Sequence, residues 1–149
     1  MKNNTLRTGK IITGKYSRMV QKYCKICGKP VSRASKGFCS NTCYAESKYN
    51  EYIEKWKNGE VTGLSGEYQL NKNIRKYIFK KYDNKCSECG WDKINPYTNK
   101  RPLEVHHKDG DYTNNKEENL QLLCPNCHSL TPTYKSRNKN GRKARKKYN

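Results

Sequence analysis

The three histidines of the chain, His106, His107 and His128, all lie in one segment that also carries two pairs of cysteines. Imidazole side chains bind divalent ions and exchange protons near neutral pH, whereas cysteines in C-x-x-C spacing hold structural metals. Histidines that served only in packing would be scattered along the chain. Their concentration between and beside the cysteine pairs therefore predicts a metal clamp that supports a second, chemically active site.

The eight cysteines fall into two sets of four, and each set opens with the pattern C-x-x-C-G. Four thiolates complete a tetrahedral shell around zinc and leave no open position, so each set is predicted to hold one structural Zn²⁺. We expect zinc rather than disulfides, because this spacing in a reducing setting is typical of metal sites. The first set is Cys24, Cys27, Cys39 and Cys43, and the second set is Cys86, Cys89, Cys124 and Cys127.

The formal net charge of +19 is distributed unevenly. Residues 1–48 carry eleven Lys or Arg against one acid, and residues 129–149 carry eight against none, whereas residues 85–128 carry six against seven acids. Cationic flanks around a nearly neutral segment suit a phosphate polymer held by the flanks, with a divalent cation in the middle. The first cysteine module could contact a phosphate backbone through its basic residues, or it could equally be a scaffold. The candidates for contacts with a phosphate backbone are Lys25, Lys29, Arg33, Lys36, Arg137, Arg142, Lys143 and Arg145.

A chain of 149 residues with 32% hydrophobic and 30% charged residues has little material for a large apolar core. Modules of this kind need metals or disulfides as staples. The first residues show no apolar signal segment, and no run is long enough to span a membrane. We therefore expect a cytoplasmic protein that is neither secreted nor bound to a membrane.

The elements that must position the histidines are predicted to be short. Apolar residues at three- and four-residue steps predict helices over residues 41–58 and 71–82. Alternation predicts strands over 103–107 and 120–123, with a polar loop over 108–118 between them. A helix beginning near Asn126 would turn Cys127 and His128 to different sides, since successive residues point about 100° apart.

Three segments, Cys86-Ser-Glu-Cys-Gly-Trp91, Leu103–Asp111 and Asn119–Thr131, resemble the HNH endonuclease family, also called His-Me finger nucleases, and in particular small HNH proteins of phages. The similarity covers residues 67–137. It implies a ββα-metal fold in which a hairpin is closed by a helix, with zinc beneath the catalytic ion. The segment Phe38–Cys43 is similar, more loosely, to a treble-clef or ribbon-like zinc finger.

The predicted fold class is thus a small, zinc-stabilised α+β protein. An HNH (His-Me finger, ββα-metal) module follows a treble-clef or ribbon-like finger and amphipathic helices. The predicted domains are a basic arm (1–22), a four-cysteine N-terminal zinc finger with its following helix (23–59), a linker (60–69), the HNH nuclease domain (70–134) and a basic, disordered tail (135–149).

Carried over by position, the resemblance implies that His106 and His128 bind a catalytic divalent ion, that His107 is the general base and that Asn119 pins the loop behind it. The implied activity is hydrolysis of phosphodiester bonds in double-stranded DNA, by nicking or double-strand cleavage, with 5′-phosphate and 3′-hydroxyl ends. The candidate phosphate contacts are then candidate DNA contacts, and the expected location is the host cytoplasm if a phage encodes the chain. The implied ion is Mg²⁺ or Mn²⁺. Some family members have aspartate in place of His106, and an imidazole there favours softer ions such as Mn²⁺, Ni²⁺ or Zn²⁺.

Several alternatives stay open at the level of sequence. A non-catalytic, zinc-containing nucleic-acid-binding protein needs only the cationic flanks and the cysteine sets. No target site is evident, so homing, restriction, packaging support and unspecific degradation are all compatible with the sequence, and double-strand cleavage would call for a homodimer or two successive nicks. We interpret Glu104, Asp109 and Asp111 as solvated acids rather than as supports of the metal ligands.

Overall fold

The computed structural model describes residues 21–139. Most of the predicted arm and tail therefore lies outside the described residues, as do the candidate DNA contacts Arg142, Lys143 and Arg145. The chain divides into two compact units, one ending at Tyr44 and one beginning at Ala45. Each unit contains one of the four-cysteine sets.

The first unit is built around a tight turn between two very short strands. β1 (Lys22–Tyr23) pairs antiparallel with β2 (Pro30–Val31). Between them, the N–H of Gly28 donates to the carbonyl of Cys24 at 3.0 Å, with Gly28 at a φ of 70°. A glycine adopts this left-handed conformation without the steric cost of a Cβ atom, so the turn can bring Cys24 and Cys27 together.

The second unit contains helices on both sides of a β-hairpin. α1 (Asn41–Lys57) begins in the first unit and continues into the second. The remaining elements of the second unit are β3 (Leu64–Ser65), β4 (Gln69–Leu70), α2 (Lys72–Lys81), β5 (Glu104–His107), β6 (Leu120–Leu123) and α3 (Pro125–Leu130).

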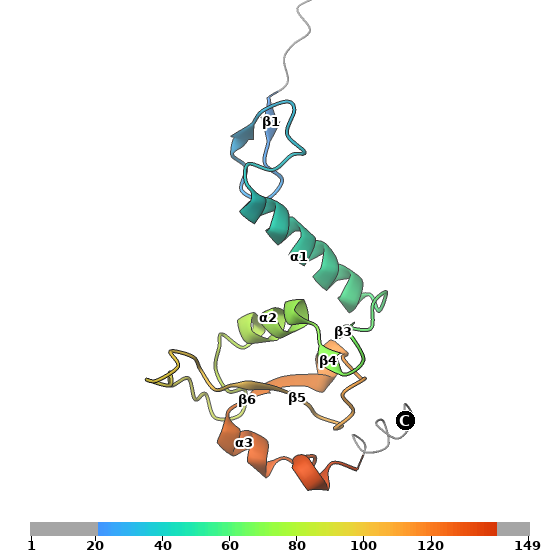
Figure 1. Cartoon of the computed structure of the whole chain (residues 1–149), viewed down its shortest axis with the longest axis vertical. Helices are drawn as coiled ribbons and strands as arrows, with labels where there is room; N and C mark the ends of the chain where they lie inside the picture. The colour runs from blue at the N-terminus through green and yellow to red at the C-terminus, as the bar shows by residue number, and fades with distance from the viewer. Residues whose placement is uncertain (1–20, 140–149) are drawn as a thin grey trace, which may run out of the picture. The chain divides into compact units, whose positions relative to one another are not determined.

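The β5–β6 hairpin is the centre of this unit. Its strands are antiparallel, with Glu104 opposite Leu123 and His107 opposite Leu120. α2 packs against β6, while α3 packs against both strands from the other side, as Figure 1 shows. A hairpin closed by a following helix is the predicted ββα arrangement. The predicted fold class, a small α+β protein with two four-cysteine groups, is confirmed.

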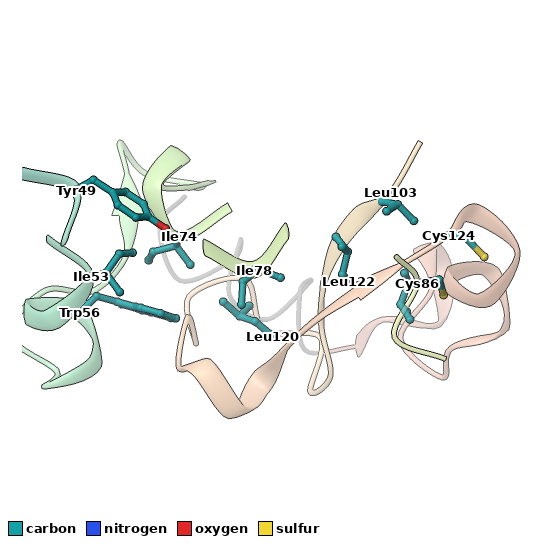
Figure 2. Packing of buried hydrophobic residues seen from close by; sticks show 11 residues of the cluster. Tyr49, Ile53, Trp56, Ile74, Ile78, Cys86, Leu103, Leu120, Leu122 and Cys124 are labelled. Carbon is teal, nitrogen blue, oxygen red and sulfur yellow. The ribbon is translucent and has the colours of Figure 1, made fainter. Parts of the chain in front are cut away.

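The core of the second unit runs along the hairpin in one continuous cluster, drawn in Figure 2. α2 contributes Ile74 and Ile78, which are fully buried against Leu120 and the other leucines of β6. Burying one such side chain stabilises the fold by about 1.5–3 kcal/mol. α1 extends the cluster at one end with Tyr49, Ile53 and Trp56, and Cys86 and Cys124 lie at the other end.

The predicted elements agree closely with the observed ones. The helices predicted over 41–58 and 71–82 are α1 and α2, and the strands predicted over 103–107 and 120–123 are β5 and β6. α2 begins after Asn71, whose side-chain oxygen accepts the N–H of Asn73 at 2.9 Å and so caps the helix. Within residues 21–139 no helix combines the length and apolar composition needed to cross a bilayer.

Two segments are more ordered than their composition suggests. Residues 60–69, predicted as a linker, contain β3 and the first residue of β4, and Gly63 among them is buried. Lys135–Arg137, the first residues of the predicted disordered tail, form a 3-10 turn. Asn138 then donates from its side-chain amide to the carbonyl of Gly110 at 2.8 Å. This bond ties the segment after α3 to the loop that follows β5.

Gly63 gives a test of the packing between residues 60–69 and the core. Its φ is +78°, and a Cβ there would lie 2.5 Å from Cδ1 of Ile74 and 3.0 Å from Cβ of Asn115. Gly63→Ala should therefore lower the free energy of unfolding by about 2–4 kcal/mol, measured by urea denaturation. Gly66→Ala is the matched control, since Gly66 has a similar φ of +68° but no neighbour within 4 Å. It should cost about 1–2 kcal/mol. If both variants lose the same free energy of unfolding, Gly63 is not packed closely against Ile74 and Asn115.

Candidate metal and catalytic site

The second cysteine set joins three parts of the second unit. Cys86 and Cys89 lie in the loop after α2, Cys124 directly follows β6 and caps α3, and Cys127 lies in the first turn of α3. The four sulfur atoms all lie within 4.8 Å of one another, and those of Cys89 and Cys124 are 3.8 Å apart. A tetrahedral site with Zn–S bonds of about 2.3 Å has sulfur–sulfur edges of about 3.8 Å. The donor set and its spacing therefore fit one structural zinc ion.

Backbone N–H groups favour the thiolate form that zinc binding requires. Burial raises the pKa of Cys86, but N–H groups of Cys124, Cys89 and Glu88 outweigh it and bring the pKa to about 6. In the first unit, N–H groups of Cys27 and Ile26 lower the pKa of Cys24, also to about 6. Both turns are thus arranged to stabilise negative charge on sulfur.

The first cysteine set fits zinc by the same criteria. Its four sulfur atoms also lie within 4.8 Å of one another, with 3.4 Å between Cys27 and Cys39 and 3.5 Å between Cys39 and Cys43. All eight cysteines are free thiols rather than disulfides. The candidate DNA contacts of this unit, Lys25, Lys29, Arg33 and Lys36, are all exposed.

The three histidines line one cavity of about 280 Å³. Neighbouring residues of a strand normally point to opposite faces, but β5 ends at His107, so the chain turns there and both His106 and His107 reach the cavity. The ring of His128 approaches from α3, with 4.9 Å between the centroids of the His106 and His128 rings. The other lining residues are Val105, Gly110, Tyr112, Thr133, Lys135 and Asn138.

His128 is oriented by a carboxylate. Its Nδ1 lies 2.7 Å from a carboxylate oxygen of Glu104, so Nε2 is the nitrogen left for another ligand. Histidines that bind metals commonly donate their other N–H to a carboxylate, which fixes the ring and raises its basicity. The interpretation of Glu104 as a merely solvated acid is therefore wrong.

His106 is held in the form that binds metals. Only 7% of this residue is exposed, and burial lowers its pKa to about 4, with a further contribution from the neighbouring His128 and His107. A neutral imidazole keeps the lone pair that coordinates an ion. His106 and His128 together offer two nitrogen ligands and leave the other coordination positions open. No third His, Cys, Asp or Glu in residues 21–139 completes a group with them.

Asn119 is hydrogen-bonded to the loop that follows β5. Its side-chain amide donates to Asp109 at 2.9 Å and to the carbonyl of Asn114 at 2.7 Å, and its oxygen accepts the N–H of Asp109 at 3.1 Å. The carboxylate of Asp109 also accepts from Asn114 at 2.6 Å, and Asp111 accepts from Thr113 at 2.7 Å. These two aspartates build the loop, so interpreting them as solvated is also wrong.

Sequence reasoning missed several residues around the histidines. Asn115 is 3% exposed, and its side-chain oxygen lies 2.8 Å from Nε2 of His107. Thr133 lies 3.3 Å from Nε2 of His106, and Lys135 lines the cavity from the segment after α3. No spacing pattern marks these residues, because amide and hydroxyl side chains in a polar loop ordinarily indicate turns.

Among the candidate DNA contacts near the cavity, Arg137 has internal partners. Its guanidinium donates to the carbonyl of Ser129 and lies 5.9 Å from the centroid of the Tyr134 ring. The Tyr134 ring in turn lies edge-on to His128, with 5.3 Å between centroids. This contact gives Arg137 a structural role beside α3 in addition to any role in binding.

Comparison with known proteins agrees with this geometry. Residues 86–131 match the family model described as HNH endonuclease. The chain is 39% identical over 94 residues to the H-N-H endonuclease F-TflIV of Escherichia phage T5. The aligned region covers 62% of this chain and 38% of that protein. It is 38% identical over 83 residues to the Zorya protein ZorE of Escherichia coli strain Crooks, covering 56% of this chain and 18% of that protein. This chain thus spans less than half of either relative's length, and no solved structure matches.

The two cysteine sets predict a metal content that can be counted. Purified protein should contain two zinc ions per chain by elemental analysis, and Cys124→Ser and Cys39→Ser should each reduce this to one. Only Cys124→Ser should abolish the cooperative unfolding of the second unit, because binding of a structural zinc is worth about 10–16 kcal/mol of folding free energy. Cys39→Ser is the matched control, since its set belongs to the first unit. Two zinc ions in Cys124→Ser would contradict the assignment.

The low pKa of His106 predicts a pH dependence of stability. The imidazole of His106 takes up a proton near pH 4 in the folded state and near pH 6.5 in the unfolded state. Lowering the pH from 6.5 to 4 therefore favours the unfolded state. The free energy of unfolding should fall by roughly 2 kcal/mol more in the wild type than in His106→Gln between pH 7 and pH 5. Urea denaturation of the zinc-loaded wild type and of His106→Gln measures the free energy of unfolding at each pH. If the two free energies fall in parallel with pH, the buried imidazole of His106 does not cause the pH dependence.

Proposed function

We propose that the chain is a metal-dependent endonuclease that hydrolyses phosphodiester bonds in double-stranded DNA, since residues 86–131 match the HNH endonuclease family model. The observation that supports this activity most directly is the cavity lined by His106, His107 and His128. It offers two imidazoles suited to one divalent ion and a third imidazole beside them, on a framework fixed by a separate zinc clamp.

In the proposed reaction, His107 accepts the proton of the attacking water through the ring nitrogen that does not face Asn115. Asn119 holds the loop after β5 in place through three hydrogen bonds, so the ring of His107 stays fixed at the end of the strand. His106 and His128 are the ligands of the divalent ion, and Glu104 orients His128. When bound, this ion supplies positive charge that stabilises the scissile phosphate and the leaving 3′ oxygen.

The proposed substrate is supported by charge. Among the described residues of the first unit, Lys25, Lys29, Arg33 and Lys36 are exposed. Lys135 adds a cation to the wall of the cavity itself. Basic side chains of this kind neutralise phosphates along a DNA backbone, and the +19 net charge of the chain favours such a polyanion.

A plasmid assay tests the activity and the base together. With supercoiled plasmid and Mg²⁺, Mn²⁺, Ni²⁺ or Zn²⁺ supplied in turn, the wild type should produce nicked or linear DNA. His107→Ala should cut about 10²–10⁴ times more slowly while binding DNA with unchanged affinity, because only proton transfer is lost. Glu51→Gln is the control, since Glu51 is an exposed residue of α1 that pairs only with Lys48 and Lys55 among the contacts described for it.

The same assay distinguishes a nuclease from a protein that only binds nucleic acid. Tight binding with intact supercoiled plasmid under every ion would refute the proposed activity. Cleavage by His107→Ala at the wild-type rate would refute the base assignment alone. Cut ends that DNA ligase rejoins without prior phosphorylation would have the expected 5′-phosphate and 3′-hydroxyl groups. Linear product that rises with the square of protein concentration would indicate a homodimer acting on both strands.

A further inference from the structure

The side chain of Asn115 is the acceptor that determines which nitrogen of His107 is protonated. The two side chains meet at 2.8 Å, between the amide oxygen of Asn115 and Nε2 of His107. Asn115 lies in the loop between β5 and β6, and only 3% of it is exposed. Water therefore has little access to compete for this contact.

The orientation of the Asn115 amide follows from its other partners. Its nitrogen lies 3.3 Å from the carbonyl oxygen of Thr62 and 3.5 Å from that of Thr113. Carbonyl oxygens accept hydrogen bonds and cannot donate them, so the amide must turn its NH₂ group toward these two atoms. Its oxygen, an acceptor, is then the atom that faces His107.

An acceptor at this place requires a proton on Nε2 of His107. In the neutral imidazole one nitrogen carries the proton and the other carries the lone pair. A proton on Nε2 leaves the lone pair on Nδ1, and a general base must have this lone pair available before it can accept a proton. The opposite tautomer would place two acceptors face to face at 2.8 Å inside a buried site.

The support for Asn115 comes from a part of the chain far from the family match at residues 86–131. The indole N–H of Trp56, in α1, donates to the backbone carbonyl of Asn115 at 2.7 Å. The carbonyl of Thr62 accepts a hydrogen bond from the side-chain amide of Asn115. Gly63 packs so closely that a Cβ added to it would lie 3.0 Å from Cβ of Asn115. Residues 56–63 therefore form a cradle that holds the asparagine in register with His107.

We propose that Asn115 is a positioning residue that fixes His107 in the tautomer with Nε2 protonated and Nδ1 free, and that residues 56–63 extend the catalytic framework beyond the HNH domain. The inference about catalysis rests on the proposed nuclease activity, whereas the tautomer can be measured without it. Asn115 differs in role from Asn119, which bonds to Asp109 and Asn114 rather than to a histidine.

Nitrogen NMR of the imidazoles tests the tautomer directly. The full-length, zinc-loaded protein labelled with ¹⁵N is examined at about pH 8.5, where imidazoles are neutral. In a spectrum that correlates ring nitrogens with carbon-bound protons, His107 of the wild type should show a protonated Nε2 and an unprotonated Nδ1. His107→Gln assigns the signals. A wild-type His107 protonated on Nδ1, or averaged between both forms, would overturn the proposal whatever the variants do.

Two substitutions at Asn115 separate positioning from folding. Asn115→Leu has the same branched shape and number of side-chain heavy atoms but no acceptor, so the His107 signals should become averaged and kcat should fall on the order of 10²–10³-fold, with KM for DNA within about threefold. Asn115→Asp keeps an acceptor oxygen for His107 but turns a second oxygen toward the carbonyls of Thr62 and Thr113, so it should keep the wild-type tautomer in a less stable protein. A wild-type kcat in Asn115→Leu would contradict the inference.

Asn71→Ala is the matched control, because it weakens the second unit without removing a described contact of Asn115. It removes the side chain that caps α2, so the protein should melt at a lower temperature while the His107 tautomer and kcat stay within about threefold of the wild type. An equal loss of kcat in Asn71→Ala and Asn115→Leu, with an unchanged tautomer in both, would assign Asn115 a structural role only. If the wild type cuts no DNA, the proposed function is refuted. The NMR spectrum would still test whether Asn115 fixes the tautomer of His107.

Discussion

The four-thiolate clamp of Cys86, Cys89, Cys124 and Cys127 is the constraint on which the site depends. α3 has only six residues, and a helix of this length is not stable by itself in water. Cys124 caps α3 and Cys127 lies in its first turn, so the sulfur cluster fixes both the start and the direction of the helix. The N–H of His128 bonds to the carbonyl of Cys124 at 2.9 Å. The clamp therefore brings the imidazole of α3 beside His106 of β5.

A second framework, built from hydrogen bonds instead of metal, holds the loop between β5 and β6. Asp109, Asn114 and Asn119 bond to one another and to the loop backbone, and Asn115 connects the loop to α1 through Trp56. Buried polar groups destabilise a fold when they lack partners and rigidify it when every one is satisfied. The three asparagines and Asp109 of this loop all have partners, so the loop can hold His107 in one orientation although it contains few apolar side chains.

The sequence predicts the features that depend on residues close together in the chain. It does not predict contacts between residues that are far apart in the chain. α1, α2, β5 and β6 follow from apolar periodicity, and the cysteine ligands follow from spacing within a few residues. The partners of Asn115 could not be predicted in this way, because Trp56 and Thr62 are more than fifty positions away and carry no pattern that points to His107. The 3-10 turn of Lys135–Arg137 could not be predicted either, for a related reason. Their basic composition is typical of disorder, whereas single bonds such as that of Asn138 to Gly110 order them.

His106 and His128 are proposed to share one exchangeable ion in the cavity that His107 also lines. Anomalous X-ray scattering from crystals of the zinc-loaded protein soaked with Mn²⁺ tests this directly. We expect one manganese peak between the His106 and His128 rings, separate from two zinc peaks at the cysteine sets, and no such peak in His128→Ala. A wild-type map with manganese elsewhere, or with these two rings turned away from each other, would contradict it.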